Sequence, residues 1–186
     1  QAEKLANFHR NYSSLNVKVV NLNLIYQEFG GGKQDIGAIR NFIKYVYQNA
    51  SSIINRVKYV NLFGDASFDF KDRIPNNTNV VPIYHSTNSY TSGESSFASD
   101  DFFVNMDDNE GNIESNIGEP DIAVGRMLIS SVSQAEEMIN KVFEYYDIKS
   151  YGSWRNNYVA ISDDSDKSSD LSLQEKQNDL TDIIYS

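Results

Sequence analysis

Aspartates follow two of the strands that the sequence predicts, and their carboxylates are the first candidates for chemistry. Asp65 comes directly after the apolar run 57–63, and Asp163 and Asp164 come directly after the run 158–162. Ligands of an open parallel sheet bind beyond the carboxyl ends of its strands, so these side chains are candidates for acid–base chemistry, metal binding or substrate recognition. The commoner role of an aspartate in this position is to cap the following turn through backbone N–H groups.

Two other stretches concentrate carboxylates. The segment 65–73 spaces Asp65, Asp69 and Asp72 between aromatic residues, a pattern that suits a divalent cation or the basic side chain of a peptide. One hypothesis is therefore a metal-dependent hydrolase that uses Asp65, Asp69 and Asp100, although no histidine is close to them in sequence. The second concentration is a candidate calcium site made of Asp100, Asp101, Asp107 and Asp108. It lacks the Asp-x-Asp-x-Asp-Gly spacing of a calcium loop, so a solvated turn is the alternative.

The residues that usually act as nucleophile and base are missing. The chain has no cysteine, which excludes a thiol nucleophile, a disulfide and a cysteinyl metal site within these 186 residues. Its two histidines, His9 and His85, have no serine in a nucleophile-elbow sequence to partner them. The glycine run 30–32 lacks the pattern of a phosphate-binding loop. We therefore expect no autonomous catalytic triad.

The charge balance narrows the class of partner. The chain carries 26 acidic and 16 basic residues, a formal net charge of −10, with no local basic cluster. Such a surface repels nucleic-acid phosphates, so we expect no nucleic-acid partner. It attracts cationic ligands, basic peptides or calcium, although solubility alone also explains the charge. No apolar run approaches the roughly 20 residues of a transmembrane segment, and the first residues, which do not resemble a signal peptide, suggest a piece of a longer protein.

Hydrophobic periodicity predicts an α/β fold, a three-layer sandwich with a mainly parallel sheet plus a hairpin. The expected helices are 2–12, 24–29, 36–49, 133–146 and a last one from about residue 173. The expected strands are 17–22, 57–63, 80–84, 102–106, 121–127 and 158–162, with a hairpin turn at 107–112. Asp35 is expected to cap the helix 36–49, and Ser133 with Glu136 to form a capping box. The polar segment 66–99 is too long for a simple connection and is expected to be functional.

Several stretches, taken in order, resemble one family. They are Leu62-Phe63-Gly64-Asp65-Ala66-Ser67-Phe68-Asp69, Val81-Pro82-Ile83-Tyr84, Ser99-Asp100-Asp101-Phe102-Phe103, Asp121-Ile122-Ala123-Val124-Gly125-Arg126, Tyr145-Tyr146 and Trp154-Arg155-Asn156. Together they look like the gingipain-like cysteine peptidases of family C25. The type resembled most is the PorU-type sortase and C-terminal signal peptidase of the type IX secretion system.

The resemblance implies that residues 1–186 are the first subdomain of a caspase-like catalytic domain. In the family, a second subdomain carries the catalytic histidine and cysteine, so this fragment is expected to be inactive by itself. By position, Asp163 or Asp164 would support the catalytic histidine. Asp65, Asp166 and Asp170 would face the substrate. No cofactor is required, and calcium, which some members bind, is compatible with the acidic loops.

The implied parent protein is a cysteine endopeptidase that removes C-terminal secretion signals from cargo and links the cargo to surface lipopolysaccharide. Its partners would be those protein substrates, the catalytic subdomain and other type IX secretion components. The implied location is extracytoplasmic, at the bacterial outer membrane surface or secreted. The alternative is a non-catalytic binding or scaffold module with a peptidase-like fold.

Overall fold

The computed structural model describes residues 1–87, 96–111, 118–161 and 171–185. The chain divides into two compact units, Gln1–Phe143 and Glu144–Ser186, which are taken separately below. Within the described residues, no helix is long and apolar enough to cross a membrane.

The first unit opens with three helices, α1 (Ala2–Tyr12), α2 (Leu22–Phe29) and α3 (Ile36–Gln48). Side-chain caps set where two of them begin, because the first N–H groups of a helix have no partner within it. Asn21 Oδ1 accepts from the N–H of Asn23 at 2.9 Å, and Asp35 Oδ1 accepts from Gly37 at 2.8 Å. The predicted helices and the Asp35 cap are confirmed.

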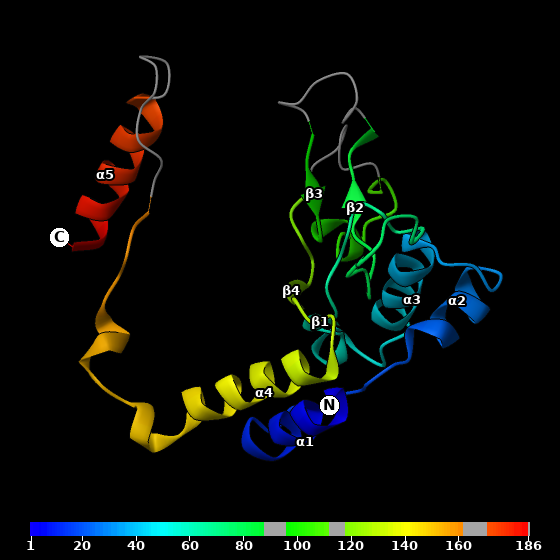
Figure 1. The fold of residues 1–186 in the computed structure, drawn as a ribbon, viewed down its shortest axis with the longest axis horizontal. Coiled ribbons are helices and arrows are strands. Elements are labelled where there is room, and N and C mark those ends of the chain that lie inside the picture. The colour runs from blue at the N-terminus through cyan, green and yellow to red at the C-terminus, as the bar shows by residue number, and fades with distance from the viewer. Residues whose placement is uncertain (88–95, 112–117, 162–170, 186) are drawn as a thin grey trace. The chain divides into compact units, whose positions relative to one another are not determined.

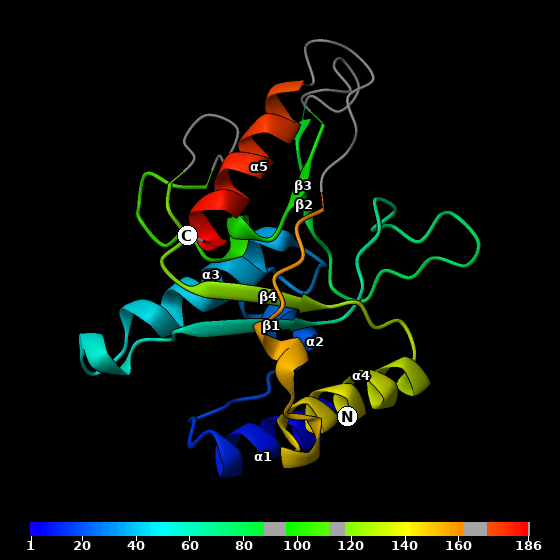
Figure 2. The same cartoon turned by 90° about the vertical axis from the view of Figure 1, so that its left-hand side faces the viewer.

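The central sheet pairs β1 (Tyr59–Phe63) with β4 (Ala123–Met127) in parallel, with Tyr59 opposite Ala123 and Phe63 opposite Met127 (Figure 2). One face of this sheet packs through Val60, Leu62 and Val124 against α2 and α3. Parallel strands need a long crossover, and here the crossover contains the polar segment and a short antiparallel pair, β2 (Tyr84–His85) with β3 (Ala98–Ser99).

The core is continuous from the helices through the sheet to the segment around 102–106. Its buried members are Ile25, Tyr26, Ala38, Ile39, Ile43, Leu62, Val81, Tyr84, Phe102, Phe103, Val104, Met106 and Ile122. After β4 the chain enters α4 (Val132–Tyr146), which lies beside α1 (Figure 1), and the rings of Phe8 and Phe143 are 4.7 Å apart. The α/β class with a parallel sheet is confirmed.

The second unit contains the end of α4 and α5 (Leu171–Tyr185), separated by two short 3-10 helices, Ile148–Ser150 and Ser153–Asn156. The guanidinium of Arg155 lies against the rings of Tyr145, Tyr151 and Trp154, at 4.2, 3.8 and 5.3 Å from their centroids. Cation–π contacts and the hydrogen bond from Trp154 Nε1 to Ser150 O (2.9 Å) order this short connection.

Three predicted strands are wrong. Residues 17–21 are not a strand, and Val19 and Val20 are exposed. The predicted strand 102–106 is a 3-10 helix, Asp101–Phe103, followed by buried irregular chain, so the antiparallel pair lies at 84–85 and 98–99 instead. Residues 158–161 are not a strand either, and Ile161 is exposed. An apolar run becomes a strand only where a neighbouring strand takes its N–H and C=O groups.

The side-chain cap of α4 lies two residues earlier than the predicted capping box. Ser131 Oγ accepts from the N–H of Gln134 at 3.2 Å, and Gln134 Oε1 accepts from the N–H of Ser130 at 2.8 Å. The predicted pair, Ser133 and Glu136, therefore falls inside the helix. Both positions have a hydroxyl followed three residues later by Gln or Glu, so the short pattern alone did not separate them.

Candidate functional site

The carboxyl ends of β1 and β4 meet, as parallel pairing requires, and the first candidate aspartate lies there. The ladder continues past the strands, with the N–H of Gly64 donating to Met127 O at 3.1 Å and that of Asp65 donating to Ile129 O at 2.9 Å. The carbonyl of Asp65 accepts from the N–H groups of Val80 and Val81 at 2.8 and 3.0 Å. The backbone of Asp65 therefore joins β1, β4 and the far end of the polar segment.

The side chain of Asp65 is half-buried and caps its own turn. Its Oδ1 accepts from the N–H of Ala66 at 2.8 Å, which is the capping role that competed with a chemical one. Its Oδ2 has no hydrogen-bond partner in the described part of the chain. One oxygen of Asp65, with its lone pairs, is therefore unpaired within the described residues at the carboxyl end of β1.

Gly64 is needed immediately before this aspartate because there is no room for a side chain. A Cβ on Gly64 would lie 2.7 Å from Val80 Cγ1 and 2.8 Å from Val81 Cγ2. The 79–81 segment can therefore press against the end of β1, and the Asp65 carbonyl reaches its two donors.

Arg126 of β4 hydrogen-bonds to several segments near the carboxyl ends of the strands. Its Nη1 donates to the carbonyls of Gly64 at 2.9 Å and Val81 at 2.7 Å, and its Nη2 donates to Pro82 O at 3.2 Å. The same guanidinium forms a two-pronged ion pair with Asp100, Nε to Oδ2 at 2.9 Å and Nη2 to Oδ1 at 2.6 Å. Both partners are largely buried, so the fixed fork of arginine matches a carboxylate and three carbonyls away from water.

Arg126 was not predicted as a site residue, although the sequence held a signal for it. It follows Val124 at the alternate position of an apolar strand, so its side chain faces the same core. A charged group on the inward face of a strand must find a partner, because an unpaired buried charge is costly.

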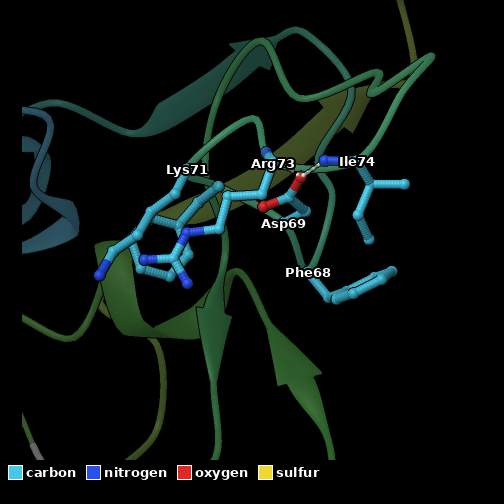
Figure 3. Close-up of a pocket in the computed structure, with 6 residues that line it drawn as sticks. Phe68, Asp69, Lys71, Arg73 and Ile74 are labelled. Carbon is cyan, nitrogen blue, oxygen red and sulfur yellow. Dashed lines mark hydrogen bonds between the residues drawn. The ribbon is translucent and has the colours of Figure 1, made fainter.

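A second cluster lies on the loop between β1 and the 79–81 segment. Asp69 is buried, and its Oδ2 accepts from the N–H groups of Arg73 at 2.6 Å and Ile74 at 2.7 Å (Figure 3). A cavity of about 320 Å³ adjoins it. The residues that line this cavity are Phe68, Asp69, Phe70, Lys71, Arg73 and Ile74. Asp69 thus serves the loop as an internal acceptor and leaves basic and apolar side chains around the cavity.

The four aspartates predicted to bind calcium have separate roles in the structure. Both carboxylate oxygens of Asp100 accept from Arg126, and Asp108 Oδ1 pairs with Lys44 Nζ at 2.7 Å. The hydrogen bond from Lys44 and its positive charge lower the pKa of Asp108. The N–H of Asp107 donates to Glu110 Oε2 at 3.0 Å, and Asp101 begins a 3-10 helix. Within the described ranges no three His, Asp or Glu side chains gather around a common point, so the four aspartates do not form one carboxylate cluster, and their calcium role stays a prediction.

The remaining predicted site residues lie outside the described residues. These are Asp163, Asp164, Asp166 and Asp170, all within the segment 162–170. Their supporting-acid and substrate-facing roles stay predictions, as does the substrate-facing role of Asp65.

The first unit is an α/β module in which helices flank a parallel sheet, with Asp65 at the carboxyl end of β1 and the largely buried Arg126 beside it. The chain belongs to peptidase family C25, whose sequence profile matches residues 1–185. It is similar to the crystal structure of dimeric latent PorU from Porphyromonas gingivalis, with a TM-score of 0.68 and 25% sequence identity. That match covers 91% of this chain and 16% of the PorU chain, so the sequence spans about a sixth of its structural relative. Comparison with curated proteins finds no match.

Proposed function

We propose that this chain is the substrate-shaping first subdomain of a C25 cysteine endopeptidase and is inactive by itself. The observation that carries the proposal is the family match over residues 1–185 of a sequence without cysteine. A cysteine peptidase needs a thiolate and a nearby base. Under this proposal, the catalytic thiolate and its base come from residues outside these 186.

Within that proposal the carboxylates of this chain recognise substrate and orient the base. The Oδ2 of Asp65, at the carboxyl end of β1, has no hydrogen-bond partner in the described part of the chain and would accept from a peptide N–H or a basic side chain. Asp163 or Asp164 would hold one tautomer of the catalytic imidazole and stabilise the imidazolium, and Asp166 and Asp170 would contact the substrate. These four roles rest on the family pattern.

Peptidase assays on two lengths of chain test the central claim. The 186-residue chain should show no turnover of a peptide library. A longer product of the same gene should cleave peptides and should lose activity after treatment with iodoacetamide, which alkylates a thiolate that this chain does not contain. Turnover by the 186-residue chain would overturn the proposal. A longer product without thiol-sensitive activity would favour the non-catalytic binding module.

The supporting acid is tested in the longer protein. Asp163→Asn and Asp164→Asn should each be compared with Asp182→Asn, an exposed aspartate on α5. The variant at the supporting acid should lose at least about 10-fold in kcat/KM, equivalent to about 1.4 kcal/mol, without a change in thermal midpoint. If neither variant differs from Asp182→Asn, these aspartates do not have the role.

We further propose that the parent protein is a sortase of the type IX secretion system. It would act outside the cytoplasm, at the bacterial outer membrane surface or after secretion. The similarity to PorU supports this reading. A thioester acyl-enzyme accounts for transfer, because an amine on a surface lipopolysaccharide can attack the acyl carbon while the thiolate leaves. The longer protein, given cargo bearing a C-terminal signal and an added amine, should yield the amide product. Hydrolysis alone would identify a peptidase without transferase activity.

Calcium is a separate part of the proposal. No group of three or more His, Asp or Glu side chains that could hold a metal ion is found among the described residues, and calcium binding stays a prediction. Titration of the longer protein with calcium, followed by calorimetry and thermal shift, should show saturable binding if calcium belongs to the enzyme. An unchanged thermal midpoint at millimolar calcium would show that this protein does not bind calcium.

A further inference from the structure

Several polar groups of the loop from Asp65 to Val81 are hydrogen-bonded within the loop. Asn77 Nδ2 donates to Asp69 O at 2.6 Å, the N–H of Ser67 donates to Asn79 Oδ1 at 3.2 Å, and the Asp69 carboxylate takes two more N–H groups. Gln34 Nε2, from the segment before α3, donates to Phe70 O at 2.9 Å. The loop is therefore an ordered structure, tied to the body of the first unit and satisfied by its own acceptors.

The outside of this loop carries large apolar side chains. Phe68 is 74% exposed, Phe70 47% and Ile74 48%, and all three line the cavity of about 320 Å³. Three such side chains around one cavity are more than the single apolar residues that surfaces ordinarily expose. The loop thus presents an apolar surface at this cavity.

Positive charge borders the same cavity. Lys71 and Arg73 line it, and neither forms an ion pair with any carboxylate of the described chain. Their side chains run to one side of Asp69, while Phe68 and Ile74 lie on the other (Figure 3). The neighbouring Asp72 does not line the cavity. Lys71 Nζ lies 5.4 Å from the ring centroid of Phe70, so this cation contacts an aromatic face rather than a carboxylate. In a chain of net charge −10, the cavity is thus a local site where two cations have no ion-pair partner among the described residues.

We propose that this cavity is a docking site for an internal segment of a partner protein in which an aromatic or aliphatic residue lies beside Asp or Glu. The apolar side chain would enter between Phe68 and Ile74, and the carboxylate would meet Lys71 and Arg73. Complementarity with the local positive charge of Lys71 and Arg73 selects an acidic segment over a basic one at this cavity. Removing Phe68 and Ile74 from water adds the apolar contribution. Docking here needs no cleavage and goes beyond the proposed peptidase role.

Binding of blocked peptides to the 186-residue chain tests the proposal by fluorescence anisotropy. The probe has the core Phe-Glu-Leu-Glu between Gly-Ser flanks, with an acetylated N-terminus and an amidated C-terminus. A second peptide replaces both Glu with Lys, and a third has a free C-terminal carboxylate and no acidic side chain. The first peptide should bind at least about 10-fold more tightly than either of the others, and its affinity should fall as salt rises.

Variants locate the site. Arg73→Gln with Lys71→Gln, and Phe68→Ala, should each weaken binding of the first peptide about 10-fold or more. Lys33→Gln and Ile53→Ala are the matched controls, because both are exposed and lie outside the cavity. Circular dichroism should show that all four proteins stay folded. Equal binding of the three peptides, tighter binding of the Lys or free-carboxylate peptide, no binding, or equal losses in the control variants would overturn the proposal.

Discussion

The guanidinium of Arg126 binds both carboxylate oxygens of Asp100, at 2.9 and 2.6 Å, and donates in addition to the carbonyls of Gly64, Val81 and Pro82. One side chain thus joins the end of β1, the 81–82 segment and the chain just after β3. This contact positions the turn that carries Asp65, and it lies inside the protein, where breaking it leaves charge and carbonyls unpaired.

Removing Arg126 should therefore be strongly destabilising. Arg126→Met should lower the free energy of unfolding by about 3 kcal/mol or more, measured by urea denaturation, because Asp100 would be left as an unpaired buried carboxylate. Glu3→Gln breaks the exposed pair between Glu3 and Arg10 and should cost no more than about 0.5 kcal/mol. A loss below about 1 kcal/mol for Arg126→Met would show that the buried network contributes little to folding.

The close approach at the end of β1 makes a paired glycine test. Gly64→Ala should destabilise by about 1–3 kcal/mol, since its Cβ would come within 2.8 Å of Val80 and Val81. Gly125→Ala, on β4, meets nothing within 4 Å and should be neutral or slightly stabilising, because alanine loses less backbone entropy. Thermal unfolding of both variants makes the comparison, and equal effects at the two sites would contradict the packing described for Gly64.

The carboxylate of Asp69 is expected to hold the 65–81 loop in shape. Asp69→Ala leaves the N–H groups of Arg73 and Ile74 without their acceptor and should cost about 1–3 kcal/mol. Hydrogen exchange should show the amides of these two residues at least about 10-fold less protected, with little change in α3. Asp72→Asn is the control, because the exposed Asp72 side chain caps nothing in the described structure. Unchanged exchange in Asp69→Ala would exclude the capping role.

The raised pKa of Tyr26 predicts that the free energy of unfolding falls at alkaline pH. Burial, followed by the nearby negative charge of Asp35, raises the pKa of Tyr26 to about 12 from its ordinary value of 10.0. A raised folded-state pKa gives stability that is complete below the unfolded pKa of 10.0 and is lost as the pH rises through about 12. Unfolding curves between pH 9 and 12 should therefore show this loss.

Tyr26→Phe should remove that part of the alkaline loss. Its hydroxyl is buried and has no hydrogen-bond partner among the described residues, so deleting it should not destabilise the protein at neutral pH. Tyr45→Phe, at a half-exposed tyrosine of α3, is the control. An alkaline profile of Tyr26→Phe identical to that of the unaltered chain would show that Tyr26 does not cause the dependence.

Helices with a wide apolar stripe and a polar cap were predictable from sequence. The α3 helix combines Ile36, Ile39 and Ile43 on one face with Asp35 at its start, and nothing outside the segment is needed to explain it. The strand at 59–63 was predictable for a related reason, since its apolar run follows a helix and ends at Gly64-Asp65. The family resemblance was also legible, because it rests on several motifs in order.

Short apolar runs were not predictable to the same degree. Residues 102–106 and 17–22 both read as strands, yet the first is buried irregular chain and the second has no strand partner before α2 begins. Phe103, Val104 and Met106 are all buried, so the run does not alternate between inside and outside as a one-sided strand would. Whether such a run becomes a strand depends on a hydrogen-bonding neighbour far away in sequence.

Sequence by itself determined the residue inventory, and with it the absence of any thiol chemistry in these 186 residues, together with the capped helices and the β1 and β4 strands. Tertiary structure alone decided what the aspartates do. Asp100 became the partner of Arg126, Asp69 became a loop acceptor, and Asp65 has one oxygen without a hydrogen-bond partner among the described residues. The physical reason is that a carboxylate takes its role from the donors brought within about 3 Å of it, and the fold brings such donors from residues as distant as 64 positions along the chain, as Lys44 is from Asp108.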